Sequence, residues 1–259
     1  MHIENIKGRL AFVSGASAGI GEAIAKMLAS NGVNLILCAR RFDRLEKLKK
    51  NLEKEFDIKI KILQIDLSKI DEIVNAINSI KNEYESIDIL INNAGLALGK
   101  DIYYNNSIED SLQMIRVNCE GLIVLTRLLL PYIIKSKYGH IVNLSSTAAD
   151  EAYSGGAIYC ATKSFVDMFG DSLRIELIDK PIKVTNIKPG AVNTEFSTIR
   201  FKGDKEKANN VYRGFNSLYA EDIADNIEYV LTRKSHVQIS TMTIMSESQA
   251  TATMIHKEK

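Results

Sequence analysis

The chain has 259 residues, of which 46% are hydrophobic and 25% are charged, as is typical of a globular protein with an ample apolar core. Its 33 basic and 32 acidic residues leave a net charge of +1, so overall charge does not favour binding to nucleic acid or to an anionic membrane. The N-terminal sequence MHIENIKGRLAF has no apolar stretch long enough for a signal peptide, and we expect a cytoplasmic protein.

Short apolar runs typical of buried strands alternate with amphipathic stretches typical of helices along most of the chain. The expected strands are Arg9–Ser14, Asn34–Ala39, Ile58–Ile65, Ile87–Asn92, His140–Ser145, Ile182–Ile187 and Val237–Ile244. The expected helices are Ile20–Ser30, Arg44–Phe56, Ile70–Tyr84, Ile108–Ile134, Tyr159–Ile178 and Ala220–Thr232. This alternation predicts right-handed crossovers and a central parallel sheet with helices on both faces. With no linker or repeat to interrupt it, the chain is predicted to form a single doubly wound α/β domain of the Rossmann type, over residues 1–259.

The first expected strand runs into a glycine-rich turn, SGASAGIG, which contains Gly15, Gly19 and Gly21. Glycines also mark ordinary turns, but here an apolar strand precedes the turn and an amphipathic helix follows it. A turn without side chains lets a pyrophosphate approach the backbone, and the helix N-terminus at Ile20 offers free amides and a positive dipole end. The turn therefore predicts a dinucleotide site.

Two arginines follow the second expected strand, where a site for NAD would carry an acid that binds the ribose 2′-hydroxyl. Arg40 and Arg41 stand there instead. Arginine matches phosphate in a bidentate fork, and a charge-assisted hydrogen bond contributes about 1.5–3 kcal/mol. A solvated arginine pair is the alternative, but together with the glycine turn the pair favours NADP. Asp43 comes too late to replace the acid and is expected to cap a helix that begins at Arg44.

Three further motifs follow in order. NNAG occupies 92–95, LSST occupies 144–147, and YCATK places Tyr159 and Lys163 four residues apart. Together with SGASAGIG and with KPGAVNTEF at 188–196, they make nearly the whole chain resemble a short-chain dehydrogenase/reductase. NNAGLALG, GGAIYCATKSF and STIRFKGD resemble one branch of that family, the NADP-dependent 3-hydroxy acid dehydrogenases, whose members oxidise serine, L-allo-threonine and related acids. The resemblance implies NADP as cofactor, a small-molecule substrate and a homotetramer.

The resemblance also implies four catalytic residues. Tyr159 would transfer the proton, Lys163 would activate Tyr159 and bind the ribose, and Ser146 would hydrogen-bond the substrate oxygen. Asn118, in RVNCEG, would complete the proton relay. Ser145 is the neighbouring alternative to Ser146, which is preferred because its thirteen-residue separation from Tyr159 matches the usual spacing in the family.

A set of cofactor contacts is implied in the same way. Asp66 matches the acid that meets the adenine ring, Asn92 the residue beside the adenine ribose, and Thr194 the residue that holds the nicotinamide carboxamide. Ser14 stands where threonine is usual, a departure that keeps the hydroxyl. The implied set is Gly15, Ser17, Gly19, Ile20, Gly21, Arg40, Arg41, Asp66, Leu67, Asn92, Ala94, Gly95, Tyr159, Lys163, Pro189, Gly190, Val192 and Thr194.

The tyrosine and lysine also make chemical sense without the resemblance. A free tyrosine has a pKa near 10, and lowering it to about 7 requires about 4 kcal/mol in favour of the phenolate. One ammonium about 4 Å away supplies about that amount at an effective dielectric constant near 20. The four-residue spacing places Tyr159 and Lys163 on one face of a helix. We therefore expect Lys163 to lower the pKa of Tyr159.

Residues 190–218 are polar and poorly periodic, and a structureless segment of that size in a compact domain is usually a functional lid. Arg200 and Lys202 within it are candidates for binding a substrate carboxylate, although loop cations are commonly just solvated. The polar tail after Ser246 is expected to fray.

Neither a disulfide scaffold nor a metal site is expected. The three cysteines, Cys38, Cys119 and Cys160, are an odd number with no close pairing, and the four histidines, His2, His140, His236 and His256, lack metal-ligand spacing. The most apolar window, Leu122–Ile134, contains Arg127 and Pro131 and is too short to span a bilayer.

Two alternatives to a hydroxy acid dehydrogenase stay open at this point. A 3-oxoacyl-carrier-protein reductase of the same family shares every catalytic residue, but would more often show a basic docking patch for the carrier. A catalytically silent dinucleotide-binding regulator belongs to another class and usually lacks the tyrosine or the lysine, whereas both are present here.

Overall fold

A seven-stranded sheet forms the centre of the protein in the computed structural model, which describes residues 4–258. Its strand order is β3-β2-β1-β4-β5-β6-β7, and every pair of neighbouring strands is parallel. The strands are β1 (Leu10–Ser14), β2 (Asn34–Ala39), β3 (Ile60–Gln64), β4 (Ile89–Asn92), β5 (His140–Leu144), β6 (Lys183–Pro189) and β7 (Thr241–Ile244). The predicted doubly wound fold of the Rossmann type is confirmed.

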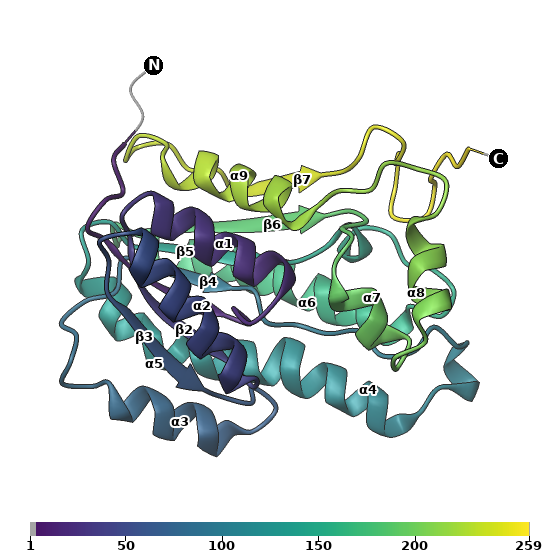
Figure 1. Cartoon of the computed structure of the whole chain (residues 1–259), viewed down its shortest axis with the longest axis horizontal. Coiled ribbons are helices and arrows are strands. Elements are labelled where there is room, and N and C mark those ends of the chain that lie inside the picture. The colour runs from purple at the N-terminus through teal and green to yellow at the C-terminus, as the bar shows by residue number, and fades with distance from the viewer. Residues whose placement is uncertain (1–3, 259) are drawn as a thin grey trace.

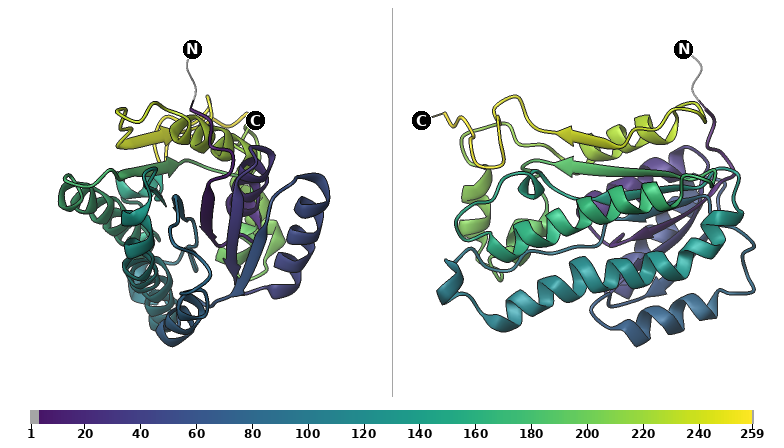
Figure 2. Two further views of the ribbon diagram at one scale, coloured as in Figure 1. Left: turned by 90° about the vertical axis from the view of Figure 1, so that its left-hand side faces the viewer. Right: turned by 180° about the vertical axis from the view of Figure 1, so that it is seen from behind.

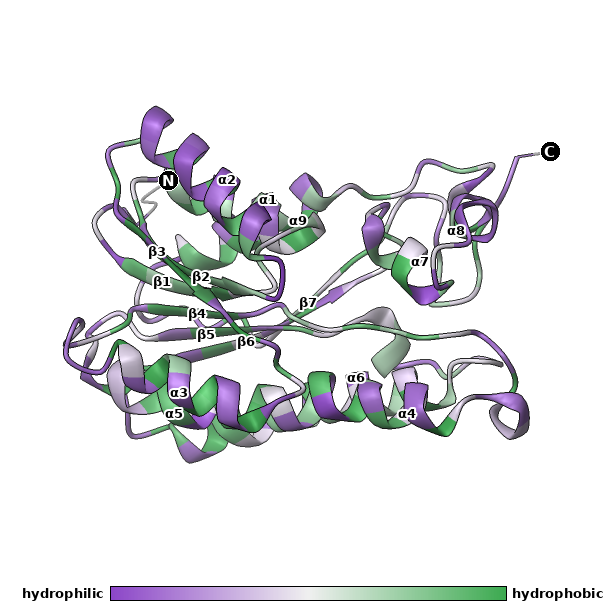
Figure 3. Cartoon of the chain, turned by 60° about the horizontal axis from the view of Figure 1, so that its bottom comes forward, coloured by the Kyte–Doolittle hydropathy of each residue, from purple (hydrophilic) through white to green (hydrophobic). Residues whose placement is uncertain are grey.

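Helices cover both faces of this sheet (Figures 1 and 2). One face carries α1 (Gly19–Ser30), α2 (Phe42–Glu55) and α9 (Ala220–Leu231), and the other carries α3 (Ile70–Ser79), α5 (Leu122–Lys135) and α6 (Ala157–Glu176). Figure 3 shows the two helical layers with their apolar surfaces turned toward the strands. Because both faces are buried, the strands are almost uniformly apolar, as parallel sheets require.

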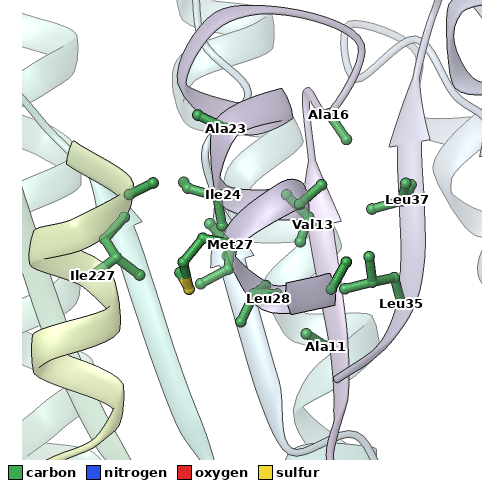
Figure 4. Close-up of a cluster of buried hydrophobic side chains, with 14 of the residues drawn as sticks. Ala11, Val13, Ala16, Ala23, Ile24, Met27, Leu28, Leu35, Leu37 and Ile227 are labelled. Atoms are coloured by element: carbon green, nitrogen blue, oxygen red, sulfur yellow. The ribbon is translucent and has the colours of Figure 1, made fainter. Parts of the chain in front are cut away.

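The core on the first face is centred on α1. Ile24 and Leu28 are completely buried between β1 and β2 on one side and Ile227 of α9 on the other (Figure 4). Burying an aliphatic side chain of this size contributes about 1.5–3 kcal/mol. This packing fixes the N-terminal end of α1, and with it the glycine turn that precedes the helix.

On the second face, α4 (Ile108–Ile115), a π-helical turn (η2, Arg116–Gly121) and α5 form one continuous run. In the described part of the chain, this run from Ile108 to Lys135 is apolar and long enough to cross a membrane, judged by length and composition alone. Leu125, Leu129 and Ile133 from this run are completely buried in the core beneath the sheet, which accounts for its apolar composition.

The structure corrects the expectation that residues 190–218 are structureless. They contain two short helices, α7 (Glu195–Arg200) and α8 (Lys205–Tyr212), which lie beyond the carboxyl ends of the strands (Figure 1). The Thr194 hydroxyl caps α7 by accepting from Phe196 N, and the Asp204 carboxylate caps α8 by accepting from Lys207 N. Helices this short have too few apolar positions to show a helical period, so the capping residues are the only sequence signal that indicates them.

Two smaller expectations are also corrected. The helix α2 begins at Phe42, so Asp43 lies in its first turn and does not cap it. The tail after Ser246 is held rather than frayed, because the Glu151 carboxylate accepts from Ala252 N at 2.9 Å and from Thr253 Oγ1 at 2.6 Å.

Candidate active site

A cavity of about 970 Å³ opens at the carboxyl ends of the central strands and is bounded on its far side by α7 and α8. Most of the residues expected in the site line it: Gly15, Ser17, Gly19, Ile20, Arg40, Arg41, Asp66, Leu67, Ala94, Gly95, Ser146, Tyr159, Lys163, Pro189, Gly190, Val192 and Thr194. Gly21, Asn92 and Asn118 belong to the expected set but do not line the cavity.

The glycine turn forms one wall of the cavity. Gly19 adopts a positive φ of +54°, and a Cβ there would lie 3.2 Å from the Thr194 Cβ on the lid side. Gly21 acts differently, because a Cβ on it would collide with the Gly15 carbonyl and the Asn93 amide. The residue before α1, Ala18, has no side chain that can cap the helix, so the first amides of α1 stay free for a ligand.

Asn92, expected beside the adenine ribose, does not turn its side chain into the cavity. Its amide is buried on the far side of the strand end, where Nδ2 donates to Thr126 Oγ1 at 3.0 Å and to Asn143 Oδ1 at 2.9 Å. The next residue, Asn93, lines the cavity, and its Nδ2 donates to Ser14 O at 2.9 Å. Neighbouring residues of a strand face opposite sides, so a shift of one position moved the prediction out of the site.

Asn118 acts on the cavity wall from behind. It lies in the π-helical turn, where its Nδ2 donates to Leu96 O at 2.8 Å and its Oδ1 accepts from Leu96 N at 2.9 Å. A second donation from Nδ2 reaches Thr162 Oγ1 on α6 at 3.0 Å. The side chain therefore ties the loop after β4 to α6, and π-helical turns are frequent at functional sites.

The three central catalytic candidates converge in the cavity. Tyr159 and Lys163 lie one turn apart on α6, and Ser146, which follows β5, lines the same cavity and lies near enough to Tyr159 to act on its pKa. The neighbouring Ser145 points elsewhere, since its Oγ donates to Lys163 O at 3.2 Å. The geometry therefore favours Ser146 over Ser145.

The pKa values differ from the expected pattern. Burial raises the pKa of Tyr159 well above its usual range, and the Ser146 side chain only partly offsets this. Burial lowers the pKa of Lys163 to about 8, against the opposing effect of Asp167. The Lys163 Nζ donates to Leu144 O at 2.8 Å and lies 5.9 Å from the centre of the Tyr159 ring. Desolvation of the buried phenolate therefore dominates the pKa of Tyr159.

Arg200 reaches the cavity from the end of α7. Its Nε donates to Gly99 O at 3.1 Å and its Nη1 donates to Tyr153 Oη at 3.1 Å. Its guanidinium carbon lies 5.5 Å from the centre of the Tyr159 ring. Within residues 4–258 its third nitrogen, Nη2, is buried and finds no acceptor. Lys202, the other lid cation, turns away and pairs with Asp110 at 2.6 Å outside the cavity lining.

Several lining residues were not anticipated as members of the site. Tyr153 and Gln249 lie outside every motif, and Asn93 lies within NNAG but was not singled out there. Phe196 packs against Tyr159 with ring centres 5.8 Å apart, so α7 contacts this tyrosine directly. Gln249 holds the base of the lid, because its Oε1 accepts from Ala191 N at 2.9 Å.

The remaining sulfur and imidazole groups show no metal chemistry in the part of the chain that the structure describes. No group of three or more His, Cys, Asp or Glu side chains is placed to hold a metal ion among residues 4–258, and His2 lies outside them. All three cysteines are free. His140 is buried against Thr185, and burial lowers its pKa to about 3.

Comparison with known proteins places this site in a family. The model for the family described as short chain dehydrogenase matches residues 9–205. A protein from Schizosaccharomyces pombe named NADP-dependent 3-hydroxy acid dehydrogenase is 40% identical over 258 residues, covering 99% of this chain and 100% of that protein. The Salmonella typhi protein named NADP-dependent 3-hydroxy acid dehydrogenase YdfG is 41% identical, covering 94% of this chain and 97% of that protein.

Solved structures agree with the sequence matches. The closed form of serine dehydrogenase complexed with NADP+ has a TM-score of 0.89 at 39% identity, covering 96% of this chain and 100% of that chain. Serine dehydrogenase from Escherichia coli has a TM-score of 0.79 at 35% identity, covering 93% and 99% of the two chains. The resemblance read from the motifs is confirmed, and the chain belongs to the short-chain dehydrogenase/reductase family.

Proposed function

We propose that the protein transfers hydride between NADP and the 3-hydroxyl of a small 3-hydroxy acid of the serine or L-allo-threonine type. Membership of the family makes it an oxidoreductase, and the names of its relatives support NADP and hydroxy acids. One observation in this chain carries the substrate class. It is the buried guanidinium nitrogen of Arg200, which lies without an acceptor in the cavity beside Tyr159.

The cavity fits NADP. Its volume of about 970 Å³ lies at the upper end of the usual range for cofactor sites, about 300–1,000 Å³. The free amides at the start of α1 suit a pyrophosphate, and the Cβ-free surface at Gly19 leaves room for its approach. Arg40 lines the cavity, and no hydrogen bond or ion pair engages its guanidinium within residues 4–258, so its donors can meet a 2′-phosphate. When bound, NADP supplies the nicotinamide that accepts or gives the hydride.

Arg200 supports an acidic substrate because its guanidinium is held in place while its Nη2 donor remains available. Its contacts with Gly99 and Tyr153 fix the plane of the guanidinium. A buried donor without an acceptor is costly, and a carboxylate is the acceptor that a guanidinium binds most strongly. A small acid whose carboxylate meets Arg200 would bring its 3-hydroxyl toward Tyr159, 5.5 Å from the guanidinium carbon at the ring centre.

Tyr159 transfers the proton, and the protonation state of its hydroxyl decides whether the site is ready to reduce a carbonyl or to oxidise an alcohol. Burial keeps its hydroxyl protonated at neutral pH, so the arrangement is ready to donate a proton to a carbonyl oxygen. Oxidation of an alcohol needs the phenolate instead. The nearby positive charges that stabilise a phenolate are Arg200 and Lys163. Oxidation should therefore accelerate as the pH rises.

The test measures reduction of NADP with serine, L-allo-threonine, 3-hydroxybutyrate and 3-hydroxyisobutyrate, each beside its methyl ester, and repeats the series with NAD. We expect each reactive acid to exceed its ester in kcat/KM by about tenfold or more, because a charge-assisted hydrogen bond contributes about 1.5–3 kcal/mol. Equal values for acid and ester would contradict the substrate class. Better turnover with NAD than with NADP would contradict the cofactor.

The homotetramer expected from the resemblance is part of this proposal. Several large apolar side chains on and just beyond α6 are exposed in the single chain: Phe165, Met168, Ile175 and Ile178. Association through helix faces of this kind would cover them. Light scattering on a size-exclusion column should give four times the mass of one chain, and a monomer would contradict the proposal.

A further inference from the structure

A cluster of ion pairs joins the lid to the wall that carries the two arginines. Glu195 is the first residue of α7, and its Oε2 accepts from Arg41 Nη1 at 2.8 Å. Both Glu195 oxygens also accept from Arg44 Nη1 at 2.9 Å. On its other side, Arg41 donates through Nε to Ser17 Oγ at 3.3 Å. One guanidinium therefore connects the glycine turn to the lid, across a cavity that Ser17, Arg41 and Glu195 all line.

This cluster does not use up the donors that a phosphate needs. Arginine has five N–H donors, and Arg41 uses the one on Nε and one of the two on Nη1, which leaves the other on Nη1 and both on Nη2. Arg40 keeps all of its side-chain donors, within residues 4–258. The ion pairs set the two guanidinium charges of Arg41 and Arg44 against the one carboxylate of Glu195, and Arg40 adds a third guanidinium to the cavity lining. The surplus of positive charge matches a phosphate monoester, which carries about −1.5 to −2 at pH 7.

Arg44 shows that the cluster is more than a phosphate site. It lies on the first turns of α2 and does not line the main cavity, so a phosphate bound there would not be its partner. Its contact is with the lid, through both oxygens of Glu195. Arg41 and Arg44 together lower the pKa of Glu195, so the carboxylate stays charged throughout the neutral range.

We propose that Glu195 is a latch that couples recognition of the 2′-phosphate to closure of the lid. Glu195 holds Arg41 in the position in which its remaining donors face the phosphate, and the same contact holds α7 against the cofactor wall. The inference rests on the proposed use of NADP. Because coupling between two events is reciprocal, a bound 2′-phosphate that orders Arg41 also strengthens the closed lid. NADPH should therefore close the lid more firmly than NADH does.

The latch makes a modest contribution. The side chains of Arg41, Arg44 and Glu195 are 38%, 42% and 47% exposed. Exposed ion pairs typically contribute about 0.2–1 kcal/mol each, so two pairs on one carboxylate contribute about 0.4–2 kcal/mol, and the middle of that range corresponds to about a threefold to tenfold change in a dissociation constant. The effect should shrink as ionic strength rises, because exposed charges are screened by salt.

The experiment compares Glu195→Gln with Glu206→Gln, which removes the same charge from the same lid. Among the described residues Glu206 lies in the first turn of α8 and forms no ion pair. Fluorescence titration gives Kd for NADPH and NADH, and stopped-flow displacement gives the NADPH dissociation rate. We expect Glu195→Gln to raise the NADPH Kd about threefold to tenfold, mainly through faster dissociation, and to change the NADH Kd much less. Glu206→Gln should change neither.

Hydrogen exchange of residues 195–212 in the unmodified chain provides a second readout that needs no variant. Protection should be greater with NADPH than with NADH, and the difference should disappear in Glu195→Gln. Equal weakening of both coenzymes, tighter NADPH binding in Glu195→Gln, or equal lid protection by the two coenzymes would overturn the latch. If the unmodified chain bound NADH as tightly as NADPH, the NADP assignment itself would fail, together with the latch that rests on it.

Discussion

The glycine turn and the lid face each other across the same cavity, but they are held in different ways. Ser14, at the end of β1, accepts from the backbone amides of Asn93 and Ala94 at 3.1 and 3.0 Å, and it is itself buried. In the lid helices only Ser197 and Ala208 are buried, and the lid meets the rest of the site mainly through polar contacts, together with the packing of Phe196 against Tyr159. The glycine turn is therefore part of the core of the fold, whereas the lid packs on the surface of that core with few buried residues.

This difference divides the work of the site. A wall fixed by the core keeps its shape whether or not a ligand is present, which suits the cofactor's phosphates and the catalytic groups of α6. A segment with few buried contacts opens at low cost and belongs to the part of a protein from which active-site lids are drawn. The fixed wall should therefore set cofactor affinity and chemistry, and the lid should set substrate choice and cofactor release.

The largest effect is expected on the fixed side. Tyr159→Phe removes the hydroxyl proposed to transfer the proton but leaves the ring in its packing against Phe196. General acid–base catalysis contributes about 10²–10⁴-fold, so kcat should fall by at least that factor. Binding of NADPH, measured by fluorescence titration, should be unchanged. Substantial turnover by this variant would remove Tyr159 from its role.

A smaller effect should separate the two cofactors. Replacing Arg40 and Arg41 with alanine removes the donors proposed to bind the 2′-phosphate, a group that NAD lacks, so the KM for NADP should rise about tenfold or more, as expected for a charge-assisted hydrogen bond. The KM for NAD should barely change. Steady-state kinetics with both cofactors test this, and equal losses would show that the pair does not contact the 2′-phosphate.

The fixed wall was much easier to predict from sequence than the lid. The helix expected at Ile20–Ser30 is found at Gly19–Ser30, because its apolar period and its glycines are local signals. The two lid helices were not predicted because their capping residues, and not an apolar period, mark them in the sequence. The side chain of Asn92 was misplaced by one residue at a strand end. The high pKa of Tyr159 follows from burial, which depends on how distant segments meet.

Two glycines test the same contrast in stability and binding. A Cβ on Gly21 would meet the Gly15 carbonyl and the Asn93 amide, and overpacking of this kind costs about 1–3 kcal/mol. A Cβ on Gly203 of the lid would meet nothing within 4 Å, although its φ of +92° makes alanine costly there by about 1–2 kcal/mol. Gly21→Ala should lower Tm and weaken NADPH binding, whereas Gly203→Ala should lower Tm alone. Equal losses of NADPH affinity would contradict the division between wall and lid.

The smallest effect concerns the pH dependence of stability. Burial lowers the pKa of Lys163 to about 8 from its usual 10.5, so between these values the unfolded chain binds more protons than the folded one. The contribution of Lys163 to the free energy of unfolding of the protein without cofactor should therefore increase as pH rises from 8 to 10.5, and it should decrease as pH falls through the same range. The charge-free variant Lys163→Met should raise Tm more at pH 7 than at pH 10. If the increase in Tm caused by Lys163→Met did not shrink with rising pH, burial would not be lowering the pKa of Lys163.

The claim that Arg200 of the lid binds the substrate's carboxylate is tested most directly by comparing 3-hydroxyisobutyrate with its methyl ester. The variants are Arg200→Ala and, as a matched control, Lys202→Ala, whose side chain pairs with Asp110 outside the cavity. Truncating one partner of a buried ion pair costs about 2–4 kcal/mol, so Arg200→Ala should lower kcat/KM for the acid by about 30-fold to 1,000-fold. It should affect the ester much less, and Lys202→Ala should affect neither. If Arg200→Ala lost the same factor on acid and ester, the lid arginine would not bind the carboxylate, and the proposed substrate class would lose the observation that carries it.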